Sequence, residues 1–281
     1  MFDDLTQRVK NDFSRVRFKA FVNRLRTTLG GQPVTLLSYD EVKEKLKIGG
    51  PVYRGVQVVP IEKIAGSLNR YHQFDRAFMP LEDQLAQRWQ NIDRAFYQEV
   101  TLPPVVLYKI GEVYFVVDGH HRVSVAREQG QDFIDAEVRE CTSKVNITAD
   151  IRLEDLEVLG EKVNFLERTD LDTIRPKADL APTIPGGYDR MLEHIAVHRY
   201  FMGLDLQRDV KEDEAVAHWY DTVYMPIVRV IRRSGVLEEF PGKTETDLYL
   251  WVLDRQRYLS QEGHKLKKPG KAARDFVDNV K

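Results

Sequence analysis

Val113–Gly130, VYFVVDGHHRVSVAREQG, is the stretch of sequence on which the fold depends. Its first five residues, Val113–Val117, are all β-branched or aromatic, which is typical of a strand buried on both faces. Asp118-Gly119 has the composition of a tight turn. From His120 the apolar spacing becomes helical, with Gly130 placed to end the helix. The stretch therefore predicts a strand, a tight turn and a helix in succession.

Three side chains that can donate hydrogen bonds open the predicted helix: His120, His121 and Arg122. They stand beside backbone N–H groups that lack helical partners, at the positive end of the helix dipole. This combination suits an anion, above all a phosphate. The same residues also fit a simpler interpretation, in which Asp118 caps the helix and the His-His-Arg run is its solvated first turn.

The run Asp118-Gly119-His120-His121-Arg122 resembles the ParB/sulfiredoxin superfamily. Related signatures at this turn are Gly-Glu-Arg-Arg in chromosome-partition ParB proteins, Gly-Cys-His-Arg in sulfiredoxins, and Asp-Gly-His-His-Arg in free-serine kinases and several uncharacterised families. The resemblance extends from about Gln57 to Glu140. It implies an α+β fold: a ParB/sulfiredoxin-like domain with a small mixed sheet whose turn holds nucleotide phosphates. Because His120 occupies the position of the sulfiredoxin cysteine, a sulfiredoxin-type redox reaction is disfavoured.

The composition is that of a globular chain long enough for one large domain or two ordinary ones. Of its 281 residues, 42% are hydrophobic and 31% are charged, and a formal net charge of −2 does not support a DNA binder that uses its whole surface. The single cysteine, Cys141, excludes an intramolecular disulfide and fits a reducing compartment. No apolar run reaches the ~20 residues of a membrane span and no signal peptide opens the chain, so we expect a cytoplasmic protein.

The rest of the chain divides into parts by composition and periodicity. We expect, in chain order, an N-terminal helical arm and lead-in (1–50), the ParB/sulfiredoxin-like domain (51–145), a linker or crossing segment (146–187), a helical C-terminal domain (188–262) and a frayed basic tail (263–281). Within the linker, Leu153, Leu156 and Leu159 predict a short helix, and Val163–Leu166 predicts a strand. In the helical domain, Pro226 is expected to kink or break a helix, and Thr244–Asp247 resembles a capping box.

Four segments of the ParB/sulfiredoxin-like domain have clear periodicity. Val56–Val59, Val105–Ile110 and Phe133–Val138 predict strands, and residues 81–98 predict a helix. Gly111-Glu112 predicts a hairpin turn into the central strand. These elements would make a small mixed sheet around Val113–Val117.

Residues 1–29 predict an amphipathic helix that ends at residues 30–33, with a short strand over Val34–Leu37. The helix is locally basic through Arg8, Lys10, Arg15, Arg17, Lys19, Arg24 and Arg26. One interpretation is an arm that meets nucleic acid or an anionic membrane surface. The other is a helix packed on the body of the protein with a solvated basic face.

Arg70 and Arg76 are further candidate ligands. Both lie in a polar, aromatic-rich segment after the first strand of the domain, and in related folds this segment faces the nucleotide. Arginine binds phosphate bidentately, so both are candidate phosphate or substrate contacts. The alternative is that the segment is a structured surface loop.

The first functional hypothesis is a nucleotide-binding protein that takes ATP, ADP or CTP, as an NTP-dependent phosphotransferase or an NTP hydrolase. Gly119 and the helix N-terminus would cradle the phosphates, His121 and Arg122 would neutralise their charge, and His120 would add a hydrogen bond. Asp118 would hold Mg²⁺ or accept a substrate hydroxyl proton, because phosphoryl transfer needs mainly positioning and charge stabilisation. Asp118, His120 and His121 are the candidate catalytic residues.

A DNA-binding regulator or nuclease of the ParB-like class is the alternative. Its support is the basic helix 1–29 and the basic tail around Lys265–Arg274. Partition proteins, however, carry a Glu-Asn-x-x-Arg motif and a helix-turn-helix, and we find neither pattern after Glu140. A third hypothesis is a non-catalytic sensor, in which the nucleotide only shifts a conformation. The chain is also a candidate homodimer.

Overall fold

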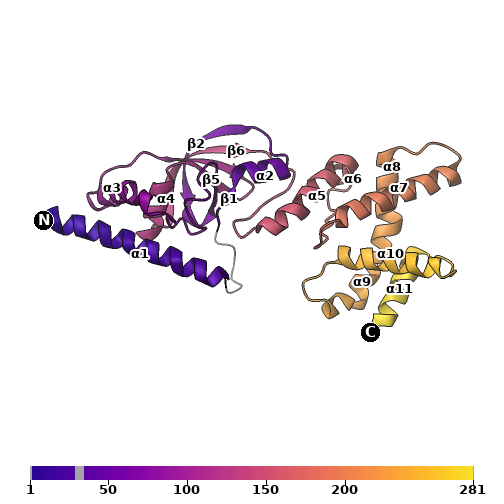
Figure 1. Ribbon diagram of the computed structural model, residues 1–281. Helices are drawn as coiled ribbons and strands as arrows, with labels where there is room; N and C mark the ends of the chain where they lie inside the picture. The colour runs from indigo at the N-terminus through magenta and orange to yellow at the C-terminus, as the bar shows by residue number, and fades with distance from the viewer. Residues whose placement is uncertain (1, 29–34, 281) are drawn as a thin grey trace. The chain divides into compact units, whose positions relative to one another are not determined.

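The computed structural model describes residues 2–28 and 35–280, and the chain divides into two compact units, Met1–Leu156 and Glu157–Lys281 (Figure 1). The first contains a six-stranded mixed sheet and the second is helical. The predicted α+β class, with a small mixed sheet, an N-terminal helix and a mostly helical C-terminal region, is therefore confirmed. The predicted helix end at residues 30–33, and Val34, lie outside the described residues. In the described ranges, no helix has the length and hydropathy needed to cross a membrane.

The sheet of the first unit has the strand order β1-β3-β5-β4-β6-β2. The strands are β1 (Leu37–Ser38), β2 (Pro51–Pro60), β3 (Ile64–Ser67), β4 (Val105–Ile110), β5 (Val113–Asp118) and β6 (Phe133–Cys141). β5 pairs in parallel with β3 and antiparallel with β4, which pairs in parallel with β6. β2 forms one edge, antiparallel to β6 along its length, and is therefore longer than predicted.

Side chains of the central strand alternate between the two faces of the sheet, as the two-residue period of a strand requires. The helices of this unit are α1 (Phe2–Thr28), α2 (Tyr39–Lys45), α3 (Ala86–Tyr97) and α4 (His120–Glu128), with 3-10 turns at Ile61–Lys63 and Asp83–Leu85. Val116 packs in the same core as Val123 of α4. Phe115 points the other way, where its ring lies 5.7 Å from that of Tyr39 in α2. Both faces of β5 are buried, as its composition predicts.

α1 packs on the body of the first unit. The ring of Phe13 lies 5.7 Å from that of Trp89 in α3. Glu128, at the C-terminal end of α4, accepts hydrogen bonds from Arg15 at 2.7 Å and from Lys19 at 2.8 Å. The structure thus supports the packed helix of the two interpretations, because these basic side chains bind carboxylates of the same chain.

The second unit is built from helices, and the linker prediction needs correction. Its elements are α5 (Leu153–Thr169, shared with the first unit), α6 (Leu171–Ile174), α7 (Gly187–Leu206), α8 (Glu212–Trp219), a π-helical turn (Tyr220–Tyr224), α9 (Met225–Ser234), a 3-10 turn (Val236–Glu239), α10 (Glu245–Gln261) and α11 (Pro269–Val280). The predicted strand Val163–Leu166 is wrong. It lies inside α5, where Leu156, Val163 and Leu166 recur at helical spacing and are buried.

Two other predictions for this unit have opposite outcomes. The prediction of a frayed tail is wrong, because α11 buries Phe276 and Val277 against the helical core, and Lys267 binds Asp275 at 2.6 Å. The capping box is confirmed: the side chains of Thr244 and Asp247 each accept from the other's backbone N–H at the start of α10. The helical run is interrupted near Pro226, as predicted: the π-helical turn Tyr220–Tyr224 stands directly before α9, and Pro226 lies in the first turn of α9.

Candidate functional site

The turn between β5 and α4 depends on Gly119. Its φ of +98° lies in the left-handed region, and an added Cβ would come within 2.6 Å of Cγ1 of Val105 on β4. Glycine is thus required both by the backbone angle and by the closeness of the neighbouring strand. Gly119, not Asp118, is the N-cap residue of α4, so the prediction that Asp118 caps the helix is wrong. No side chain caps this end, and its first turn contains no acidic residue.

We expect Gly119→Ala to destabilise the first unit by about 2–4 kcal/mol, since alanine adds both backbone strain and overlap with Val105. Gly130→Ala is the matched control: its φ is +74°, but nothing lies within 4 Å of the added Cβ. That variant should lose only about 1 kcal/mol. Urea denaturation of the two variants gives the comparison. Equal losses would show that the contact with Val105 does not constrain the turn.

A polar hollow of about 270 Å³ lies at the N-terminal end of α4, and we name it the α4 pocket. It is lined by Asn69, Arg70, Arg88, Ile92, Val117, Asp118, Gly119, His120, His121 and Arg122. The structure therefore brings together the predicted residues of the turn and Arg70, which lies just after β3. The pocket combines basic side chains with the positive end of a helix dipole, an arrangement that favours anions.

His121 is the unusual group of the α4 pocket. Its side chain is only 4% exposed, and neither ring nitrogen has a hydrogen-bond partner among the described residues. One edge of its ring packs against Phe74, with ring centroids 5.4 Å apart. Burial, helped by the charges of Arg88 and Arg70, lowers the pKa of His121 to about 4. The imidazole is therefore neutral at pH 7, with a donor and an acceptor that are both unsatisfied.

His120 is held in place by a buried serine. Nε2 of His120 lies 2.8 Å from Oγ of Ser67, which also accepts the backbone N–H of Arg70 at 2.9 Å. Burial, with the charge of Arg70, lowers the pKa of His120 to about 3. Ser67 thus links the last residue of β3, the Arg70 backbone and the His120 ring.

Two arginines give the α4 pocket its positive charge. Arg70 makes only a 3.3 Å hydrogen bond to the Gln73 side chain, and Arg88, on α3, is exposed. Neither pairs with a carboxylate among the described residues. No local pattern in the sequence identifies Arg88, because its place depends on how α3 packs beside α4. One partial signal was available in the sequence. Trp89 indicates the buried side of the predicted helix, which places Arg88 on its polar side.

Arg122 is already bound to the chain itself. Its guanidinium donates to the carbonyl oxygens of Pro103 and Pro104, the latter at 2.9 Å, and to the Asp118 carboxylate at 2.5 Å. It therefore ties the segment before β4 to α4. The predicted role, a free cation that neutralises phosphate, does not match this geometry.

Arg76 lies outside the α4 pocket, so its prediction as a site residue is corrected. Its guanidinium donates to the carbonyl oxygens of Ala149 at 2.6 Å and Ile151 at 2.7 Å. Burial lowers its pKa. Arg76 fixes the chain that follows β6. Its end of the segment is structured, but Phe74 and Asp75 beside it are fully buried, so the interpretation as a surface loop does not describe it.

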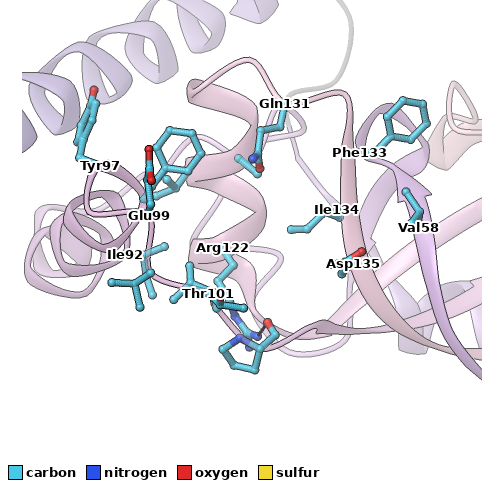
Figure 2. A pocket seen from close by; sticks show the side chains of 16 residues that line it. Val58, Ile92, Tyr97, Glu99, Thr101, Arg122, Gln131, Phe133, Ile134 and Asp135 are labelled. Atoms are coloured by element: carbon cyan, nitrogen blue, oxygen red, sulfur yellow. Dashed lines mark hydrogen bonds between the residues drawn. The ribbon is translucent and has the colours of Figure 1, made fainter.

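A second hollow adjoins the α4 pocket at Ile92 and Arg122. This groove has a volume of about 720 Å³. Figure 2 shows Arg122 from α4, Glu99 and Thr101 from the segment after α3, and Ile134 from β6 around it. Most of its remaining lining is apolar. A ligand that extends beyond the α4 pocket on this side would meet apolar surface.

Of the described residues that line the α4 pocket, Asp118 is the one carboxylate, and its side chain is 60% exposed. Within the described parts of the chain, no three His, Cys, Asp or Glu residues gather as a metal site would require. A metal ion at Asp118 would therefore need oxygen ligands from a bound molecule. Mg²⁺ is commonly bound in this way, by one or two carboxylates together with phosphate oxygens.

Comparisons with known proteins leave the family open. No protein-family model matches the chain, and no curated protein matches it. Among solved structures, the chain is similar to the C2221 crystal form of a Pnob8-like ParB-N domain, at 12% sequence identity and a TM-score of 0.22. That match covers 82% of this chain and 98% of the other. Membership of the ParB/sulfiredoxin superfamily therefore stays a prediction from the Asp118–Arg122 motif.

Proposed function

We propose that the α4 pocket binds the phosphate groups of a nucleoside di- or triphosphate such as ATP, ADP or CTP. His121 carries this proposal. A buried polar group without a partner costs about 1–3 kcal/mol, and a phosphate oxygen that accepts the ring N–H of His121 would remove the part of that cost due to the unpaired donor. The cost is acceptable in a protein whose working state has the ligand bound.

The charges around the pocket support the same ligand. Arg70 and Arg88 have no carboxylate partners within the described residues. The pocket also lies at the N-terminal end of α4, where the first backbone N–H groups of a helix lack helical partners. Whole small-molecule sites usually measure about 300–1,000 Å³, so a hollow of about 270 Å³ suits phosphate groups rather than a complete nucleotide. The nucleoside would therefore lie outside the α4 pocket.

Asp118 is the proposed Mg²⁺ ligand, together with oxygens of the bound phosphates. When bound, Mg²⁺ would offset the charge that develops on the transferred phosphoryl group. As a phosphotransferase or hydrolase, the chain would need a base for the attacking hydroxyl or water. Asp118 is the candidate for this base, as the alternative to its Mg²⁺ role. The neutral ring of His120, whose pKa of about 3 makes it a weak base, would add a hydrogen bond, and His121 would hold the phosphoryl oxygens.

His121→Phe tests the proposal, because it is expected to separate binding from folding. Phenylalanine keeps a flat ring against Phe74 and removes the two unpaired nitrogens, so the thermal midpoint should stay unchanged or rise. Nucleotide affinity, measured by titration calorimetry with ATP, ADP, CTP and GTP with and without Mg²⁺, should fall about tenfold or more. Unchanged affinity in a folded variant would contradict the proposal.

The hypothesis of a DNA-binding regulator or nuclease rests partly on the basic side chains of α1, and several of these are paired with carboxylates of the same chain. Arg15 and Lys19 bind Glu128, and Arg17 binds Asp83 at 2.9 Å. These cations of α1 are therefore partly neutralised within the chain. DNA binding stays a prediction, and an affinity that falls steeply with salt would be its mark.

A further inference from the structure

α7 is apolar on two opposite sides. Its inner side buries Tyr188, Met191 and Ile195 in the core of the second unit. Its outer side carries Val197, Tyr200, Phe201 and Leu204, which are 56%, 64%, 58% and 57% exposed. These four follow the spacing i, i+3, i+4, i+7 and so share one face, which we name the outer stripe. A contiguous exposed apolar face of this kind marks an interaction surface.

The outer stripe has a symmetric order along the helix. Val197 and Leu204 lie at equal distances from the midpoint between Tyr200 and Phe201. A second copy of α7, running antiparallel about a two-fold axis at this midpoint, would place Val197 opposite Leu204 of the other copy. It would also place Tyr200 opposite Phe201 of the other copy. Such a contact is isologous, the commonest form of homodimer interface.

Opposite charges flank the outer stripe at equal separations in the sequence, with Glu193 on α7 and Arg208 just after its last residue, Leu206. Glu193 stands four residues before Val197, and Arg208 stands four residues after Leu204. The backbone N–H of Arg208 donates to the carbonyl of Gly203 at 3.2 Å, so this arginine stays against the last turn of α7. In the antiparallel arrangement Glu193 of each copy faces Arg208 of the other. A parallel pair would instead place like charges opposite each other.

The two charged groups can both take part. Glu193 makes no ion pair within the described residues. Arg208 donates to both carboxylate oxygens of Glu214, at 2.9 and 2.5 Å, and to the Asp209 carbonyl at 3.1 Å. Its side chain is 51% exposed, so its remaining N–H donors would be shared between Glu214 and Glu193 of the other copy. Beside the stripe lies a hollow of about 710 Å³, lined in part by Tyr200, Gly203, Leu204 and Arg208. It offers room for an aromatic ring of the other copy.

We propose that two copies of this chain associate through the outer stripes of α7 in an antiparallel pair. The contact is independent of the α4 pocket, which lies in the other unit. Because a pair of short helical stripes is small beside a standard protein interface, the association is weak and depends on concentration.

Sedimentation velocity of the full chain over a concentration series tests the association. The chain should shift from monomer toward dimer as its concentration rises. Phe201→Glu should raise the dimer dissociation constant about tenfold or more, because it places a carboxylate in the apolar centre. Tyr258→Glu, at a 61% exposed aromatic residue on α10, is the matched control and should leave association unchanged. A wild-type chain that stays monomeric at its highest soluble concentration would overturn the proposal.

Charge exchange tests the antiparallel arrangement. Glu193→Arg and Arg208→Glu should each weaken self-association. In a dimer of either variant, both contacts between residues 193 and 208 join side chains of the same charge. Mixing the two variants should restore a heterodimer, because both contacts then join opposite charges. In the same way, Val197→Cys should form a disulfide with Leu204→Cys in a mixture, with the native Cys141 buried and not competing. A Val197→Cys chain that links to itself, or a mixture that stays monomeric, would refute the arrangement.

Discussion

Replacing Arg70 or Arg88 by alanine is expected to lower the affinity for a nucleoside triphosphate by about 10- to 100-fold each, because each loses a charge-assisted hydrogen bond to phosphate. No carboxylate in the described part of the chain pairs with either arginine, whereas Asp118 already pairs with Arg122. Both should leave the fold intact, since Arg88 is exposed and Arg70 makes only a long hydrogen bond to Gln73. Titration calorimetry with ATP and Mg²⁺ measures the change.

Arg94→Ala is the matched control for Arg88→Ala. Arg94 lies on the same helix, α3, but does not line the α4 pocket and contacts the Asn91 side chain. Both variants remove one positive charge from the unit, so a general charge effect would lower both affinities alike. A loss confined to Arg70→Ala and Arg88→Ala would support the site. If wild type, Arg70→Ala and Arg88→Ala bind ATP with equal affinity, the α4 pocket is not the phosphate-binding site.

The free energy of unfolding is expected to fall as the pH rises through about 6, because of a buried carboxyl between α1, α3 and α4. Asp93 is fully buried and accepts a hydrogen bond from Gln129 at 2.7 Å, but no described residue donates a hydrogen bond to its Oδ2. Burial raises the pKa of Asp93 from 3.8 to about 6, and the nearby negative charge of Asp12 adds to the increase. Between these values the unfolded chain releases the proton while the folded chain keeps it, which disfavours folding as the pH rises.

Asp93→Asn should remove this pH dependence, since the amide has nearly the same shape and carries no charge. The variant should match wild type in stability near pH 4. It should exceed wild type by on the order of 3 kcal/mol at pH 8. Urea denaturation between pH 4 and 8 gives the difference. Asp83→Asn is the control, because that carboxylate is 88% exposed and should show no such trend. A constant difference between Asp93→Asn and wild type would contradict the expectation.

The central unit of the fold could be predicted from sequence because its signals are local. Five consecutive β-branched or aromatic residues, a glycine and a change to helical spacing specify β5, the turn and α4 within one short stretch. The hairpin from β4 follows from Gly111-Glu112 in the same way. The error at Val163–Leu166 has the opposite origin. A short apolar run has no period of its own, and only the buried Leu156 upstream shows that the run is helical.

The roles of individual arginines depend on distant partners that no local pattern reveals. Arg122 stands in the motif, but the carbonyls of Pro103 and Pro104 and the Asp118 carboxylate bind it. Arg76 lies near Arg70 in sequence, yet it turns to the chain after β6. Arg88 lies in a helix that the sequence predicts, but it reaches the pocket only through tertiary packing. Composition can therefore indicate that a segment is basic, whereas the position of each charge depends on the complete fold.

The pairing of Arg122 with Asp118 also determines the net charge of the α4 pocket. Their charges cancel, and the lowered pKa values of His120 and His121 keep both rings neutral at pH 7. The guanidinium groups of Arg70 and Arg88 remain, so the pocket presents two positive charges. A bound dianion would make it electrically neutral, and both inorganic phosphate in its dianionic form and ATP with one Mg²⁺ meet that condition. Free ATP would leave an excess of negative charge, so electroneutrality by itself favours the magnesium complex as the ligand.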